Sequence, residues 1–488
     1  MTETAPEHLS VEIIIGIVAS GLLVESSSGV SRKPKAPEVR KENMKRYCKN
    51  VDIKDVQFIE GCILKWIKGK TKREDVRKLL ANYSSYSKRQ IEAIVEDTIN
   101  MYTWINPIIH DIAVDVSNRI QNRKLDLPPI RYKMKYDDGS RKWRRIGIQK
   151  PMHQIMDYIA VGACEELFLA KIGRYQMASL PGRGQEKGAA TIQRWIQTDE
   201  SHTRYYAQAD IKKCYPSIDH CKLKSVFARD IKNPELIWLI NELIDCFDDG
   251  LSIGSYFSQW ACNYYLSSAY HYATENLYKI KSRRGKTERT RLVYHVMFYM
   301  DDILFLGSSK KDVEAAMNLF AMYIQDSLGL SIKPGWILRN VDYIKNGTRR
   351  GSYIDMMGYR IYRDHITIRR RTYKRIRRTM IRVYQKITSG MVLLIETAYR
   401  ALSYCAKVQH TDCAKIWKKY SVGKIKSFAC KAISNHDKMV AEKRRRRLHE
   451  NRNSSFAGAA GRDYLQPASQ QDSGMLDSKE HQGGSCPF

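Results

Sequence analysis

LVYHVMFYMDDILFLG, residues 292–307, places a short acidic turn between two apolar runs. The β-type residues on either side predict a hairpin whose tip carries Asp301 and Asp302. Such a tip can be a plain turn, because Asp is common in turns. Adjacent carboxylates between apolar strands repel each other, however, and their pKa values rise unless a cation pairs with them. Mg²⁺ prefers oxygen ligands of this kind, so the pair is a candidate metal site.

Two segments upstream add a third carboxylate and a glycine-containing loop. YYAQAD, residues 205–210, reads as a short strand that ends at Asp210, and Tyr215 follows within DIKKCYPSID. GLSIGSYFSQWACNYYL, residues 250–266, contains Gly254, which suits a backbone that passes close to a ligand, and the hydrogen-bonding Gln259. Taken singly, each segment is an ordinary strand end or a loop before a buried helix. The order of the three segments is what points to a function.

In that order the segments resemble motifs A, B and C of reverse transcriptases, with DIKKCYPSID as motif A, SIGSYFSQ as motif B and YMDD as motif C. The similarity extends outward in both directions. KWRRIGI (142–148) and SLPGRGQEKGA (179–189) resemble two fingers motifs, LGLSIKP (328–334) motif D, MMGYRIY (356–362) the primer grip, and SYCAKVQHTDCAKIWKKY (403–420) the thumb. The resemblance covers roughly residues 41–435, so we expect an RNA-directed DNA polymerase similar to the bacterial enzymes.

The resemblance implies nucleotidyl transfer with two Mg²⁺ ions, which activate the attacking primer oxygen and stabilise the leaving one. The expected ligands are the carboxylates of Asp210, Asp301 and Asp302 and the main-chain carbonyl of Ile211. Lys333 stands at the motif D position from which a lysine would donate a proton to the departing pyrophosphate. We therefore expect Asp210, Asp301, Asp302 and Lys333 to be the catalytic residues.

The residues that the resemblance places around the nucleotide come from separate motifs. Arg144 would bind the triphosphate through two parallel N–H hydrogen bonds, a bidentate geometry that Lys cannot make. Tyr215 stands where a ring collides with a ribose 2′-hydroxyl, so the substrates should be deoxynucleoside triphosphates and the product DNA. The pocket is completed by Ile253, Gly254 and Gln259, and the primer grip by Met357, Gly358 and Tyr359.

Motif B distinguishes subgroups of the family. Retroviral and group II intron enzymes usually show QGxxxSP, whereas residues 253–259 of this chain read IGSYFSQ. This form resembles the enzymes of diversity-generating retroelements and the phage-defence reverse transcriptases of the unknown-group and abortive-infection-like kinds. An apolar Ile253 in place of Gln leaves fewer polar constraints near the nascent base pair. Reduced fidelity, most visible opposite template adenine, is the resulting hypothesis.

The chain is strongly basic, with 83 Lys and Arg against 52 Asp and Glu among 488 residues and a formal net charge of +31. This excess favours a polyanionic partner, because neutralised phosphates release counterions. Residues 369–386 contain nine Lys or Arg and no acid, while Tyr373, Ile376, Met380, Val383 and Ile387 recur at helical spacing. We expect this helix to contact the template–primer duplex through Arg369, Arg370, Arg371, Lys374, Arg375, Arg377 and Arg378.

The predicted fold class is α+β, a right-hand polymerase with fingers, a palm built on a small antiparallel sheet, and a helical thumb. We expect an N-terminal extension or linker (1–40), N-terminal helices and fingers (41–203), palm with fingers elements (204–361), thumb (362–440) and a disordered basic and polar tail (441–488). The tail has too few apolar residues to offset its ordering entropy. In the helical region, Ile91, Ile94, Val95 and Ile99 should share one face. Asp138-Gly139 marks the turn of a fingers hairpin.

The expected partners are an RNA template, a DNA or RNA primer, deoxynucleoside triphosphates, a cognate structured noncoding RNA and an accessory protein. No apolar run reaches the ~18 residues of a membrane helix, and eleven cysteines without a CxxC pair suit reduced thiols in a bacterial cytoplasm. The alternatives are a catalytically silent RNA-binding scaffold, a group II intron-type reverse transcriptase and an RNA-dependent RNA polymerase. The retained acids, Arg144 and Tyr215 favour an active enzyme that makes DNA, whether in a retroelement or in antiviral defence.

Overall fold

The computed structural model describes residues 45–97, 99–137, 142–283, 286–409 and 411–460. Its N-terminal part is helical, as predicted, with α1 (Val56–Ile67), α2 (Glu74–Asn82), α3 (Lys88–Glu96) and α4 (Met101–Gln121). Ile91 and Val95 are buried on α3 and Ile94 packs against them, but Ile99 lies beyond the helix and is 89% exposed. The Asp97 carboxylate accepts hydrogen bonds from the backbone N–H groups that follow it, which ends the helix before Ile99.

The predicted fingers hairpin is present as β1 (Arg131–Asp137) and β2 (Lys142–Ile148), which pair antiparallel. Its turn, at Asp138-Gly139, lies outside the described residues. Three helices follow: α5 (Pro151–Ala163), α6 (Glu165–Lys171) and α7 (Gln185–Thr198). The helices α5 and α6 are separated at Cys164.

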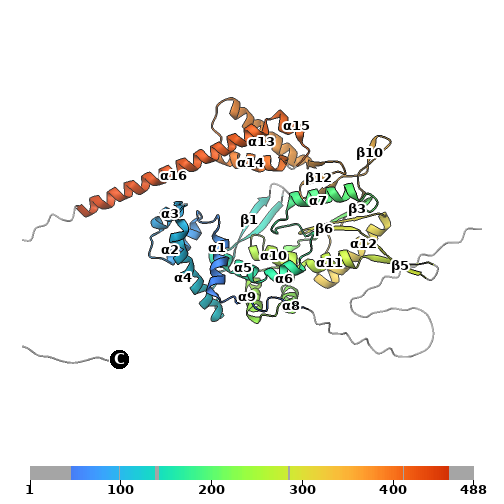
Figure 1. Cartoon of the computed structure of the whole chain (residues 1–488), viewed down its shortest axis with the longest axis horizontal. Coiled ribbons are helices and arrows are strands. Elements are labelled where there is room, and N and C mark those ends of the chain that lie inside the picture. The colour runs from blue at the N-terminus through green and yellow to red at the C-terminus, as the bar shows by residue number, and fades with distance from the viewer. Residues whose placement is uncertain (1–44, 98, 138–141, 284–285, 410, 461–488) are drawn as a thin grey trace, which may run out of the picture.

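The palm is a four-stranded antiparallel sheet in the order β6-β7-β3-β8. These strands are β3 (Tyr205–Asp210), β6 (His295–Tyr299), β7 (Asp302–Gly307) and β8 (Ile337–Asn340). The helices α11 (Ser267–Glu275) and α12 (Lys310–Tyr323) pack against it, while α7 packs with it in a second apolar cluster (Figure 1). Between β3 and α11 lie the 3-10 turn η1 (Tyr215–Ser217) and the helices α8 (His220–Asp230), α9 (Pro234–Asp245) and α10 (Tyr256–Tyr265).

Besides the β1–β2 hairpin and the palm sheet, the described residues form three smaller sheets. One is the hairpin of β4 (Tyr278–Arg283) and β5 (Lys286–Arg291), which follows α11. Another is the hairpin of β9 (Tyr343–Lys345) and β10 (Thr348–Arg350), which follows β8. A π-helical turn, η2 (Ile324–Leu328), follows α12. The third sheet has the order β11-β12-β13, from β11 (Ile354–Met356), β12 (Tyr359–Ile361) and β13 (Ile366–Ile368). The predicted α+β class, with small antiparallel sheets, is confirmed.

The C-terminal helices are α13 (Arg370–Thr388), α14 (Ile395–Gln409), α15 (Ala414–Lys419) and α16 (Val422–Ala460), and α13 to α15 gather above the palm in Figure 1. They share a separate apolar cluster that includes Ile376, Met380 and Val383. The prediction of a disordered tail from residue 441 is wrong for residues 441–460, which continue α16. Residues 441–448, AEKRRRRL, are all strong helix formers, which favours continuation of the helix.

Residues 1–44 and 461–488 lie outside the described part of the chain. Within the described residues, no helix is long and apolar enough to cross a membrane. The predicted bounds of fingers, palm and thumb, and the cytoplasmic location, stay predictions.

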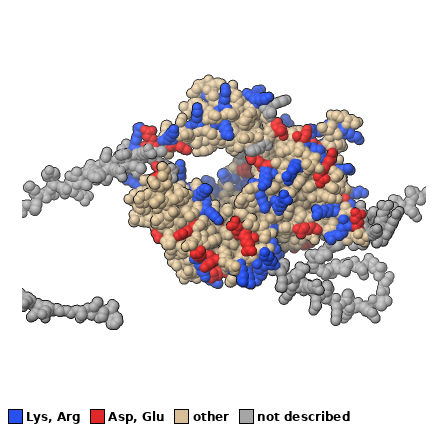
Figure 2. All heavy atoms as spheres, viewed as in Figure 1, with Lys and Arg blue, Asp and Glu red and all other residues tan. Residues whose placement is uncertain are grey.

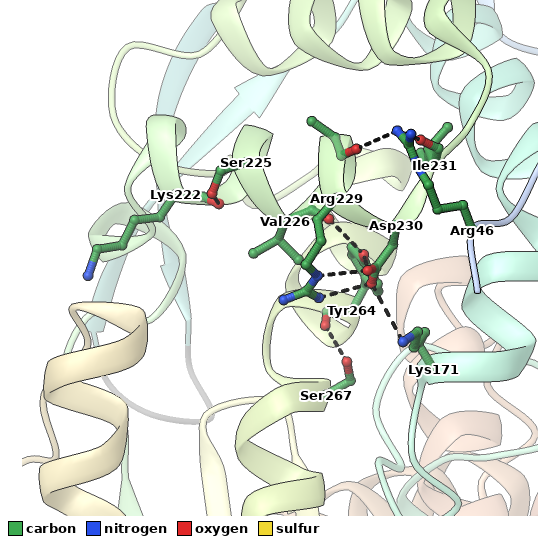
Figure 3. Close-up of polar contacts among 11 residues, drawn as sticks. Arg46, Lys171, Lys222, Ser225, Val226, Arg229, Asp230, Ile231, Tyr264 and Ser267 are labelled. Atoms are coloured by element: carbon green, nitrogen blue, oxygen red, sulfur yellow. Dashed lines mark hydrogen bonds and ion pairs between the residues drawn. The ribbon is translucent and has the colours of Figure 1, made fainter. Parts of the chain in front are cut away.

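The buried carboxylate of Asp230 joins α8 to α10, and the start of the described chain bonds to the backbone beside it (Figure 3). Asp230, at the end of α8, accepts two hydrogen bonds from Arg229, at 2.7 and 2.9 Å, and one from the Tyr264 hydroxyl at 2.7 Å. Lys171 lies 3.8 Å from the same carboxylate. Arg46 donates to main-chain carbonyls on both sides of Asp230, which fastens the N-terminal segment to α8.

Candidate active site

The acidic hairpin is built as the sequence predicts, with β6 and β7 joined at Met300 and Asp301. Met300 has a φ of +56°, a left-handed conformation that a non-glycine residue rarely adopts. The turn is held from outside, because the Ile211 N–H donates to the Asp301 carbonyl at 2.9 Å. Lys333 is held in the same way, by a 2.8 Å hydrogen bond from its N–H to the Asp210 carbonyl. Motifs A, C and D are thus joined through their backbones.

The three predicted carboxylates come together at this junction. Asp210 and Asp302 are opposite each other in the β3–β7 register, and their side chains are hydrogen-bonded. Burial, and then the hydrogen bond and charge of Asp210, raise the pKa of Asp302 to about 8. Burial also raises the pKa of Asp301. The pKa of Asp210 is lowered, first by the Asp302 hydrogen bond and then by its ion pair with the Lys333 ammonium group.

The chemistry of these donors fits Mg²⁺, which takes carboxylate and carbonyl oxygens. Burial raises the pKa values of Asp301 and Asp302, and a cation bound beside them would favour their charged forms. Among the residues that the structure describes, no three Asp, Glu, His or Cys side chains are yet arranged to hold one metal ion. A metal bound here would compete with the ion pair between Lys333 and Asp210. Asp210, Ile211, Asp301 and Asp302 are the residues that would hold it.

The fingers hairpin brings two cations toward the acids. Arg144 lies on β2, is about half exposed, and pairs with Asp137 at 3.2 Å. The charge of Arg144 partly offsets the rise in the pKa of Asp301. The charge of Lys142 contributes to the lowered pKa of Asp210. Lys142 and Arg144 are two residues apart on one strand and therefore share a face. Lys142 was not singled out from the sequence, although it begins the KWRRIGI motif.

Tyr215, within motif A, begins η1, and its ring is half buried against the main core. Burial raises the pKa of its hydroxyl, so the ring is neutral and apolar over the physiological range. The Tyr215 carbonyl accepts from the Leu251 N–H at 2.9 Å. A Cβ at Gly250 would lie 2.3 Å from that same carbonyl oxygen, so only glycine allows motif B to approach motif A this closely.

The motif B loop lies against the fingers strand β2. The Ile253 carbonyl accepts from the Gly147 N–H at 3.0 Å, and its side chain is half buried. Gly254 has a φ of +114°, and a Cβ there would lie 2.7 Å from the Gly147 carbonyl oxygen. Gln259 is half buried one turn into α10. The loop therefore places Ile253 and Gly254 beside the strand that carries Arg144.

The predicted primer grip is the turn between β11 and β12. Met357 and Gly358 both have positive φ, at +56° and +83°, and Met357 and Tyr359 are buried. The Gly358 carbonyl accepts from the Arg369 N–H at 3.2 Å. The Lys407 ammonium group lies 4.8 Å from the centre of the Tyr359 ring. The turn is thus attached both to the start of α13 and to α14.

The basic residues of α13 divide into two groups. Arg370, Lys374, Arg377 and Arg378 are exposed. Arg369, just before the helix, pairs with Asp355 at 2.6 Å, and Arg371 and Arg375 are half buried. Figure 2 shows an opening between the C-terminal helices and the rest of the molecule, with Lys and Arg side chains on both of its sides. This distribution suits a polyanion that lies along the exposed face of α13.

Comparison with known proteins bears on this site. Residues 133–335 match the family model described as reverse transcriptase (RNA-dependent DNA polymerase), a range that includes every predicted catalytic and nucleotide-binding residue. The chain therefore carries the domain of an RNA-directed DNA polymerase, a nucleotidyltransferase. No curated protein gives a significant match to the chain.

Similar solved structures include two of telomerase from Candida tropicalis. The apo telomerase truncated from its C-terminal domain is 11% identical with a TM-score of 0.34, and the match covers 58% of this chain and 69% of that one. The telomerase in complex with the TWJ fragment of telomeric RNA is 10% identical with a TM-score of 0.34, over 71% of this chain and 69% of that one. Likeness at these values says nothing about the template or partners of this chain.

Proposed function

We propose that this polymerase extends a primer 3′-hydroxyl on an RNA template with deoxynucleoside triphosphates, using two Mg²⁺ ions. One observation carries the proposal: Asp210 and Asp302, from two distant segments, are opposite each other on paired strands, with Lys333 paired to Asp210 and Asp301 in the adjoining turn. A silent RNA-binding scaffold has no need for this arrangement, because buried carboxylates without a cation are costly. The motif B form supports a place in a bacterial retroelement or an antiviral defence system, with a cognate structured noncoding RNA as a partner.

Each candidate residue has a distinct task in this reaction. Asp210, Asp301 and Asp302, with the Ile211 carbonyl, would hold the metal ions, which supply an activated attacking oxygen and a stabilised leaving group. Arg144 binds the triphosphate from β2 through a fork of N–H donors. Lys333 carries a proton on Nζ beside Asp210 and is the candidate donor to pyrophosphate.

The sugar and the duplex are recognised away from these acids. The neutral ring of Tyr215 fills the volume that a 2′-hydroxyl would need, which favours deoxynucleotides. The turn at Met357 and Gly358 would hold the primer end, and the exposed cations of α13 would bind backbone phosphates.

The test is primer extension by the full-length chain on an RNA template in Mg²⁺. Asp301→Asn should abolish extension while template–primer binding persists, because only the metal site loses a charge. Asp326→Asn, an exposed acid on η2, is the matched control and should extend like wild type. Failure of the wild type to extend any primer would support the scaffold, and wild-type rates in Asp301→Asn would refute this metal site.

A further inference from the structure

Asp157 is a fully buried carboxylate that the reaction above does not use. It lies on α5, at the N-terminal end of α10, with 0% of its surface exposed. One oxygen, Oδ2, accepts hydrogen bonds from the Ser255 hydroxyl at 2.8 Å and from the Phe257 N–H at 3.2 Å. The other, Oδ1, accepts from the Gln149 amide at 3.3 Å. These three donors are all neutral.

The Ser255 hydroxyl connects Asp157 to the motif B loop. It caps α10 by accepting from the Ser258 N–H at 3.0 Å. The Ser258 hydroxyl accepts in turn from the Ser252 N–H at 3.3 Å. Asp157, Ser255 and Ser258 therefore hold the chain on both sides of Ile253 and Gly254.

The Gln149 contact connects Asp157 to the end of the fingers strand β2. Gln149 is two residues beyond Gly147, whose N–H holds the Ile253 carbonyl, and it follows directly after β2. One carboxylate thus joins the loop that carries Ile253 to the end of the strand that carries Arg144. Oδ2 binds Ser255 of the loop, and Oδ1 binds Gln149 at the end of the strand.

Stability alone does not account for a charge at this position. A buried carboxylate with only neutral donors costs desolvation free energy, which an isosteric Asn would avoid. Hydrogen bonds to a charged acceptor, however, are stronger and shorter than those to a neutral amide oxygen. The positive end of the α10 dipole adds to them. The charge therefore gives a stiffer loop rather than a more stable fold.

We infer that Asp157 is a positioning residue for nucleotide selection, which sets the motif B loop against the end of β2 and so fixes the pocket between Ile253 and Arg144. This inference rests on the proposed function, because it names a residue that tunes the same site. Asp157 touches neither the substrate nor the carboxylates at the reaction centre; it acts through Ser255 and Gln149.

The test is single-nucleotide extension by the full-length chain, with KM and kcat measured separately for correct and incorrect deoxynucleotides. Asp157→Ala should raise the KM for the correct nucleotide about tenfold, the effect of losing one charge-assisted hydrogen bond, and should lower base discrimination. Template–primer affinity should not change. Asp157→Asn keeps the shape and one acceptor oxygen but loses the charge and the second acceptor, so its KM should lie between those of wild type and Asp157→Ala. Asp230→Asn, a buried carboxylate that accepts from Tyr264 at the other end of α10, is the control for general destabilisation and should keep the wild-type KM.

A second measurement does not depend on activity or on the Asp157→Ala variant folding. Hydrogen exchange in Asp157→Asn and in Ser255→Ala should be faster than in wild type at the amides of Phe257 and Ser258. An unchanged KM together with unchanged exchange would overturn the role of Asp157. A wild type that extends no primer would instead overturn the proposed function, whatever the exchange shows.

Discussion

Asp210 and Asp302 are directly opposite each other where β3 pairs with β7, and a hydrogen bond joins their carboxyl groups. Burial, and then this contact with Asp210, raise the pKa of Asp302 to about 8. The contact depends on register, because a slip of one residue would turn Asp302 to the other face of the sheet. Apolar β7, buried from Ile303 to Gly307, fixes that register.

Tyr215→Ala should admit ribonucleotides. The half-buried ring is neutral and packs against the core beside motif B, so its removal opens space without leaving a buried charge. We expect the preference for deoxynucleotides, measured as the ratio of kcat/KM values, to fall by a factor of ten or more, on the order of 1.4 kcal/mol. Tyr215→Phe keeps the ring and should keep the selectivity. Equal sugar selectivity in Tyr215→Ala and wild type would show that another group excludes the 2′-hydroxyl.

Replacing Lys374, Arg377 and Arg378 with Gln should weaken template–primer binding. These side chains are exposed on α13, so their replacement removes charges that face phosphates without opening the apolar cluster beneath them. The slope of log affinity against log salt should become shallower by about 0.9 for each phosphate that is no longer neutralised. Lys65, Lys68 and Lys72, exposed among the N-terminal helices, give a triple Gln control of equal charge. A slope equal to that of wild type would mean that this face is only solvated.

Ile253→Gln should raise fidelity, most visibly opposite template adenine. Ile253 is held through its carbonyl by Gly147, so the backbone of the loop does not depend on its side chain. A Gln amide adds a donor and an acceptor that a mismatched base would leave unpaired. The error spectrum of cDNA copied from a defined template measures the effect, with Ile253→Val as an apolar control. If all three enzymes make the same errors, neighbouring residues set the fidelity.

The stability of the protein should depend on pH through Asp157. Burial raises its pKa from the ordinary 3.8 to about 6, so the folded state binds the proton more tightly than the unfolded state does. Its contribution is fully present below pH 4 and is lost as the pH rises to about 6, a change of roughly 3 kcal/mol. Tyr158 and Cys246, which face it, have raised pKa values and do not titrate in this range.

Asp157→Asn removes this titration. The difference in unfolding free energy between the variant and wild type should therefore shift in favour of the variant between pH 4 and pH 7. Denaturant unfolding at several pH values measures it. A difference that stays constant across the range would mean that Asp157 keeps an ordinary pKa in the folded chain.

The sequence was sufficient for the acidic hairpin and for Asp210, because each depends on a local pattern of apolar residues that ends in a carboxylate. Lys333 was placed only by resemblance, and the structure brings it to Asp210. Asp157 could not have been found in this way. It is one acid inside an amphipathic helix, and its partners Ser255 and Gln149 become neighbours only after α5 and α10 pack.

Two errors in the fold prediction have local causes. Ile99 fits the periodicity of α3, but the side chain of Asp97 competes for the backbone N–H groups and ends the helix. The length of α16 was missed because the tail was judged by its apolar content alone. Intrinsic helix propensity can extend a helix beyond the part that packs.

The Gly358 turn is attached to the C-terminal helices, so a movement of these helices is expected to move the turn. Arg369 holds the turn at one end of β13, and at the other end the Asp412 side chain holds the Ile366 N–H at 2.7 Å. Both contacts lie on the path from the primer-grip turn to α13 and α14. A duplex that pushes these helices outward is therefore expected to tilt the turn as well. If α13 binds the template–primer duplex, as proposed, the width of the duplex would then affect the position of the Gly358 turn.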